Sequence, residues 1–217
     1  MAVAHFCLVR REDGLPVKKL QIVLLSVLAA CSYGVIHDQI TARLCIEYFT
    51  VAHPPLFHTG STTLLALCWG VSATAGIGAA LGVVLALVSQ SDGPTPYPIS
   101  RLGRSLLLLL AIMAASAFLA GVVGYELSHG GFISIPSGLA GALPAQQHDR
   151  FMAVWFAHGA SYLAGLAGGA LLCFNVWRAR GRPSVISLFP YTRAAALRVG
   201  LLAAIAAYIV WLRFGAH

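Results

Sequence analysis

Residues 62–88 read TTLLALCWGVSATAGIGAALGVVLALV and contain no charged side chain. A bilayer core about 30 Å thick needs about 20 apolar residues in a helix, so this stretch predicts a membrane-spanning helix. Comparable apolar runs occur elsewhere, and the five candidate spans are residues 20–36, 62–88, 106–127, 151–177 and 194–212. The predicted fold class is all-α, an integral membrane bundle of five helices that forms one domain over residues 1–217.

The composition supports the same fold class. Hydrophobic residues make up 59% of the chain and charged residues 10%, whereas about a quarter of the residues in a soluble domain are charged. The net charge of +7 comes from Lys and Arg residues that lie in short clusters between the apolar runs. Membrane topology explains such clusters, so we expect the lipid bilayer, and no nucleic acid, as a partner.

The positive charges also predict an orientation. They are Arg10, Arg11, Lys18 and Lys19 before the first span, Arg101 and Arg104 between the second and third, and Arg178, Arg180, Arg182 and Arg193 between the fourth and fifth. Lys and Arg beside membrane spans stay on the cytoplasmic side. We therefore expect a multi-pass protein of the cell inner membrane with its N-terminus inside, its C-terminus outside, and residues 37–61 and 128–150 on the outer face.

The first span admits a second interpretation. Two lysines, a short apolar run and the sequence Leu28-Ala-Ala-Cys31 resemble a lipoprotein signal peptide. Cleavage before Cys31 would leave four spans. The apolar run continues to Ile36, which favours a retained helix, and the chain alone leaves the choice open.

Small residues recur at helix-packing spacing in three of the candidate spans, as in Gly78-x-x-x-Gly82 and Gly165-x-x-x-Gly169. Such spacing lets helix backbones approach closely within a membrane. It predicts a compact bundle, and it leaves open whether copies of this chain or other membrane subunits pack against it.

Ionisable residues gather in one segment after the first span, from Tyr33 to Pro55. It contains His37, Asp38, Arg43, Glu47 and His53. Ionisable residues near membrane depth are costly and usually functional, so we expect a functional site at this face of the membrane.

A further histidine, His158, lies about two turns, ~10 Å, inside the fourth span. An imidazole at that depth needs a partner, and we expect it to face residues 37–53. Imidazole and carboxylate groups are the ligands of Zn, Fe, Mn or Cu sites in helical bundles. The predicted metal ligands are His37, Asp38, Glu47, His53 and His158. A straight helix would point Asp38 and Glu47 in opposite directions, so a site that uses both requires a bend.

The main functional hypothesis is a metal-dependent or redox membrane enzyme. Glu47 or Asp38 would act as a ligand or general base, and Tyr48, Ser161 and Tyr162 would contact the cofactor. The alternative is a non-catalytic accessory or structural subunit in which Asp38, Arg43 and Glu47 form an ion-pair network. A small transporter is the third hypothesis.

Two motifs resemble a group of bacterial proteins. The run His37-Asp-Gln-Ile-Thr-Ala-Arg-Leu-Cys-Ile-Glu-Tyr-Phe-Thr50, followed by His53-Pro54, is similar to a stretch in uncharacterised bacterial multi-span membrane proteins. Trp155-x-x-His158-x-x-Ser-Tyr162-x-x-Gly165 resembles their later helix. The resemblance implies a bacterial inner membrane, and it implies no particular reaction.

Overall fold

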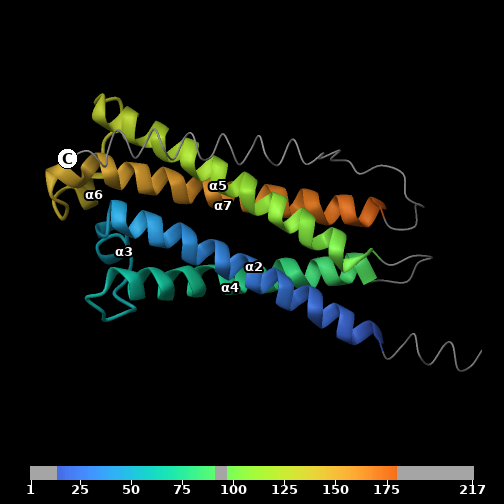
Figure 1. Cartoon of the computed structure of the whole chain (residues 1–217). Helices are drawn as coiled ribbons and strands as arrows, with labels where there is room; N and C mark the ends of the chain where they lie inside the picture. Colours follow the sequence, from blue (N-terminus) through green and yellow to red (C-terminus); the bar gives the residue numbers. More distant parts are fainter. Residues whose placement is uncertain (1–13, 91–96, 180–217) are drawn as a thin grey trace, which may run out of the picture.

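A computed structural model of the chain describes residues 14–90 and 97–179. The four long helices are α2 (Gly14–Leu44), α4 (Thr62–Gln90), α5 (Ile99–His129) and α7 (His148–Ala179). Three short elements, α3 (Glu47–Thr50), α6 (Ser137–Ala140) and the 3-10 helix η1 (Ala145–Gln147), join them at one end of the bundle (Figure 1). The described residues include no strand, and the expected span at 194–212 lies outside them.

The long helices have the length and composition of membrane spans. All four are apolar enough to cross a bilayer, and only 17 to 22% of their most apolar windows is buried within the protein. The remaining apolar surface is suited to contact with lipid. The prediction of an all-α fold is therefore confirmed for the described residues, and their four long apolar helices are compatible with a membrane bundle.

The C-terminal end of the first span was predicted at the wrong residue. We expected a loop from residue 37 onward, but α2 continues as one helix to Leu44. Its polar side chains Asp38 and Thr41 are only 5% and 3% exposed, whereas Ile36 and Ile40 are 63% and 58% exposed. The polar face is turned into the bundle and the apolar face outward, so the helix continues although its sequence becomes less apolar.

The bundle is built from two helix pairs, α2 with α4 and α5 with α7. In the first pair Gly70 lies against the α2 backbone, and a Cβ atom there would stand 2.6 Å from the Val35 nitrogen. In the second pair a Cβ atom on Gly124 would stand 2.7 Å from the Met152 carbonyl oxygen. The predicted close approach at Gly78 and Gly82 is also present, against α2.

Two apolar clusters hold the helices together. One packs α2, α4, α5 and α7 at the end that is opposite α3 and includes Ile22, Leu85, Leu102, Leu106 and Val176. The other surrounds α3 and includes Ala42, Cys45, Tyr48, Phe49, Leu65, Phe151 and Val154. The second cluster fixes the short α3, which carries Glu47 and Tyr48, against α7 and α4.

Asp149 links the C-terminal end of α5 to the N-terminal end of α7. Its two carboxylate oxygens accept hydrogen bonds from Ser128 Oγ at 2.7 Å and from His129 Nδ1 at 3.0 Å. This contact joins the last turn of α5 to the first turn of α7 across the intervening loop. Asp149 also stands in the first turn of α7, where a negative charge is favourable to the helix dipole.

Candidate metal centre

Three potential metal ligands meet between α2 and α7. His37 and Asp38 come from α2 and His158 from α7, and one ligand atom of each lies within 4.8 Å of the others. His158 Nε2 is 3.9 Å from Asp38 Oδ1, and the two imidazole ring centroids are 4.5 Å apart. The prediction that His158 faces this part of the chain is confirmed.

Two of the three side chains are buried, and the third, His37, is half-buried. Asp38 and His158 are each 5% exposed. His37 Nε2 is buried and has no hydrogen-bond partner among the described residues. An unsatisfied buried polar atom costs free energy, so this nitrogen is suited to a ligand.

Thr41 connects the two histidines. Its hydroxyl donates to the His37 carbonyl oxygen at 3.1 Å, and its oxygen lies at hydrogen-bond distance, 3.2 Å, from His158 Nε2. Thr41 lies one turn beyond His37 on the same face of α2. The contact fixes the imidazole of His158 next to Asp38.

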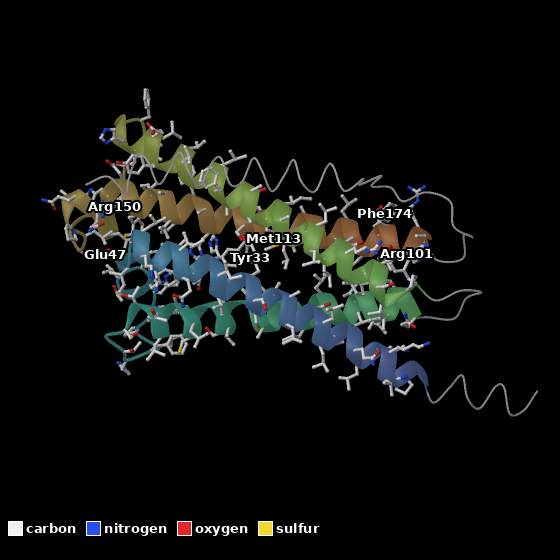
Figure 2. The ribbon with its side chains drawn as sticks, in the orientation of Figure 1. Tyr33, Glu47, Arg101, Met113, Arg150 and Phe174 are labelled. Atoms are coloured by element: carbon white, nitrogen blue, oxygen red, sulfur yellow. The ribbon has the colours of Figure 1, made fainter. Side chains whose placement is uncertain are left out.

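Aromatic rings close the group on two sides. Tyr48 stacks on His158 with centroids 4.5 Å apart, and Tyr33 stacks on His37 at 5.6 Å. The Tyr33 hydroxyl is 2.7 Å from Ser161 Oγ, and Figure 2 shows Tyr33 on the face of α2 toward α7. Tyr162 is more distant from His158, at 6.2 Å, and is 46% exposed. The predicted cofactor contacts Tyr48 and Ser161 thus border the group, and Tyr162 lies at its edge.

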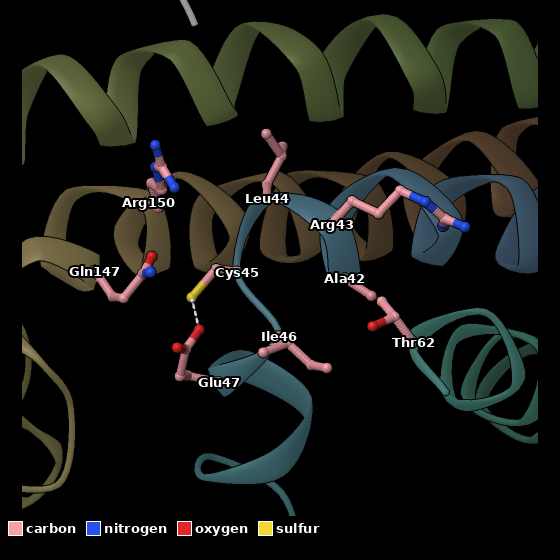
Figure 3. A pocket seen from close by; sticks show the side chains of 9 residues that line it. All are labelled: Ala42, Arg43, Leu44, Cys45, Ile46, Glu47, Thr62, Gln147 and Arg150. Carbon is pink, nitrogen blue, oxygen red and sulfur yellow. Dashed lines mark hydrogen bonds between the residues drawn. The ribbon is translucent and has the colours of Figure 1, made fainter. Parts of the chain in front are cut away.

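Two of the five predicted ligands are not brought into this group. The helix breaks between Leu44 and Glu47, as a shared site would require, but the break turns Glu47 toward the loop side. Its carboxylate accepts a hydrogen bond from Cys45 Sγ at 3.3 Å (Figure 3). His53 Nδ1 lies 2.7 Å from the Tyr48 carbonyl oxygen, and its ring packs on Trp69. Metal binding by Glu47 and His53 stays a prediction without support from this geometry.

The ion-pair network predicted for Arg43 is wrong. Its guanidinium bonds to the Gln39 carbonyl oxygen at 2.7 Å and to Thr63 Oγ1 at 2.9 Å. Neither Asp38 nor Glu47 pairs with it among the described residues. Arg43 points to the outside of α2, whereas Asp38 is turned inward, because five residues along a helix do not share one face.

Two residues that contact the group were not predicted as site residues. Tyr33 and Thr41 lie four residues before and four residues after His37. Spacing by four places them on one helix face, and this was the signal that would have found them once the helix was known to continue past Ile36.

Comparison of the chain with protein-family models, with curated proteins and with solved structures finds no match. Fold and site therefore define the class. The described residues form an all-α bundle with four helices long and apolar enough to cross a membrane, and a group of two histidines and one aspartate lies between α2 and α7.

Proposed function

We propose that this protein is a metal-dependent membrane enzyme whose metal ion is held by His37, Asp38 and His158. The observation that carries the proposal is the convergence of these three side chains from two helices to within 4.8 Å. Bonds from Zn²⁺ to imidazole and carboxylate are about 2.0–2.2 Å long. Two donors on one ion therefore lie closer together than 4.8 Å, so the side chains would have to rotate toward one another when the ion binds.

Burial favours a metal over a purely structural polar group. A carboxylate and two imidazoles inside a membrane bundle cost several kcal/mol unless they are paired. Asp38 has no guanidinium or ammonium partner among the described residues, and its nearest ion-pair contact is His158 at 3.9 Å. A divalent cation would satisfy Asp38 and the buried His37 Nε2 together.

The ligand set suggests the chemistry. Three protein ligands leave coordination positions open for water or substrate, which is the pattern of catalytic metal sites. Two histidines with one carboxylate suit Zn²⁺ as a Lewis acid, or Fe²⁺, for which such a set is typical of oxygenases. Thr41 would orient His158, and the rings of Tyr48 and Tyr33 would border the reacting groups.

The location proposed for this enzyme is the bacterial inner membrane. The similarity of the two motifs to bacterial multi-span proteins supports the bacterial origin, and the distribution of Lys and Arg supports an N-terminus on the cytoplasmic side. The metal site then lies in the outer half of the bilayer, close to the non-cytoplasmic face.

The test is metal analysis of the full chain, purified in detergent. We expect elemental mass spectrometry to find about one transition-metal ion per protein chain. His158→Ala and Asp38→Asn should each lower the content at least tenfold, because the loss of one of three ligands removes a large part of the binding free energy.

The matched control is His58→Ala, which removes an exposed histidine. It should leave the metal content unchanged. Equal loss in the control would indicate adventitious binding. A native chain that holds no metal after purification and after reloading with Zn²⁺, Fe²⁺, Mn²⁺ or Cu²⁺ would favour the accessory subunit or the transporter.

A further inference from the structure

A second polar region lies at the loop end of the bundle, outside the metal centre. It is an open cavity of about 320 Å³. Its lining is drawn in Figure 3 and consists of Ala42, Arg43, Leu44, Cys45, Ile46, Glu47, Thr62, Gln147 and Arg150. These residues come from the end of α2, the turn into α3, and the starts of α3, α4 and α7, together with the last residue of η1, so five elements meet around the cavity.

The positive charges of this cavity have no anionic partner within the described chain. The side chain of Arg150 makes no hydrogen bond or ion pair with the described residues. Among the described residues, the bonding partners of Arg43 are the neutral groups of Gln39 and Thr63. Figure 3 shows Arg150 on one side of the cavity and Arg43 on the other, with the Arg43 side chain extending away from Arg150. Two uncompensated guanidinium groups at one cavity favour an anion, and phosphate is an anion that arginine binds well.

Two hydrogen-bond acceptors at the cavity lack a strong donor among the described residues. Gln147 Oε1 is buried and lacks a hydrogen-bond partner among the described residues. The Glu47 carboxylate has only the weak S–H donor of Cys45 in the described structure. An ammonium group would supply both a positive charge for Glu47 and an N–H for Gln147.

The cavity stands at headgroup depth. α2 and α5 have 31 residues each, which is about 46 Å of helix at 1.5 Å per residue. The bilayer measures about 40–45 Å with its headgroup regions included. The ends of the spans, where the cavity opens, therefore reach the zone of the phosphates and amines of lipids.

We propose that this cavity binds the headgroup of an aminophospholipid. The lipid phosphate lies toward Arg150 within the field of Arg43, and the primary ammonium lies between Glu47 and Gln147. Phosphatidylcholine offers the same phosphate but no N–H donor, and phosphatidylglycerol offers no positive charge. The inference does not depend on the metal centre, since it uses none of its ligands.

The test is lipid binding to the full chain, measured by native mass spectrometry in detergent with phosphatidylethanolamine, phosphatidylcholine and phosphatidylglycerol of the same acyl chains. A hydrogen bond to a charged group is worth about 1.5–3 kcal/mol, so we expect phosphatidylethanolamine to bind about tenfold more tightly than phosphatidylcholine. Glu47→Gln should abolish that difference, and Arg150→Gln should weaken the binding of both lipids about tenfold.

The matched control is Arg104→Gln, at the opposite end of the bundle, which should change nothing. Equal binding of phosphatidylethanolamine and phosphatidylcholine to the native chain would overturn the proposal without any variant. Tighter binding of phosphatidylglycerol would show a simple anion site and would also overturn it. Displacement of the lipid by an equal concentration of free O-phosphoethanolamine would show that the ligand is soluble rather than a lipid.

Discussion

Thr41 holds two histidines with one hydroxyl group, which makes it the residue where the geometry of the metal centre is most easily tested. Thr41→Val keeps the shape but leaves His158 Nε2 without its hydrogen-bond partner. We expect a loss of about 1 kcal/mol in the free energy of unfolding, seen as a lower unfolding temperature in detergent. Thr41→Ser, which keeps the hydroxyl, should restore the native value. Equal stability of the two variants would show that the contact with His158 is not made.

Cys45 should be unreactive although it lies beside the surface cavity. Burial raises the pKa of its thiol to about 12, and the hydrogen bond to Glu47 acts in the same direction. The thiolate is the reactive form, so at pH 8 the group is almost entirely protonated and the rate of alkylation should rise steadily as the pH is raised toward 12.

The measurement is the rate of reaction with N-ethylmaleimide in a variant that retains Cys45 as its single cysteine. We expect it to be about a thousandfold slower at pH 8 than that of an ordinary thiol, which follows from three units of pKa. Glu47→Gln should accelerate the reaction because it removes the negative charge. Rapid labelling of the native side chain at pH 8 would contradict the burial of Cys45 at 2% exposure.

At the scale of the helices, the contact of α2 with α4 depends on a glycine. A Cβ atom at Gly70 would stand 2.6 Å from the Val35 nitrogen, whereas a Cβ atom at Gly76, in the same helix, would meet nothing within 4 Å. Gly70→Ala therefore forces the helices apart, and we expect it to destabilise the protein by about 1–3 kcal/mol. Thermal unfolding in detergent measures the effect.

Gly76→Ala is the control for helix propensity. It should leave the stability unchanged or raise it by up to about 1 kcal/mol. Because Val35 lies within a few residues of His37, Gly70→Ala should also lower the metal content, whereas Gly76→Ala should not. Equal effects of the two substitutions would mean that the α2–α4 contact does not have the geometry described here.

The elements differ in how far the sequence could predict them. The run at 62–88 became α4 almost without change, because an uncharged apolar run of that length has no other stable state in a membrane. The first span was predicted to end at Ile36 because His37 and Asp38 are polar. Hydropathy does not show which way a side chain points, and the interior position of Asp38 depends on α7, which follows more than a hundred residues later.

The sequence was equally limited in predicting which side chains of the candidate site point inward. The depth of His158 in its span predicted that it needs a partner, and this reasoning identified the partner segment correctly. It did not distinguish His37 and Asp38, which lie beside His158, from Glu47 and His53, which do not join the group. The break after Leu44 decides which of these face inward, and neither glycine nor proline marks it in the sequence. The packing of Tyr48 and Phe49 in the apolar cluster against α7 sets the direction of the chain there.

For the whole molecule, the arrangement of the spans predicts which loops share a side of the membrane. The segment after α2 and the segment after α5 lie at the same end of the bundle (Figure 1). Of the described cations, Lys18, Lys19, Arg101, Arg104 and Arg178 lie at the other end. Since Lys and Arg favour the cytoplasmic side, the end with the metal centre and the headgroup cavity should be outside.

Single cysteines in a cysteine-free variant test this orientation. Leu56→Cys and Phe132→Cys place thiols at positions that are 61% and 80% exposed, and both should react with a membrane-impermeant maleimide added to intact spheroplasts. Ser100→Cys, at the other end, should react only after lysis. Labelling of Ser100→Cys alone in intact cells would show that the protein has the opposite orientation, with the metal centre in the cytoplasmic half of the membrane. Labelling of Leu56→Cys and Phe132→Cys from opposite sides would contradict the bundle itself, because four antiparallel spans place these two loops together.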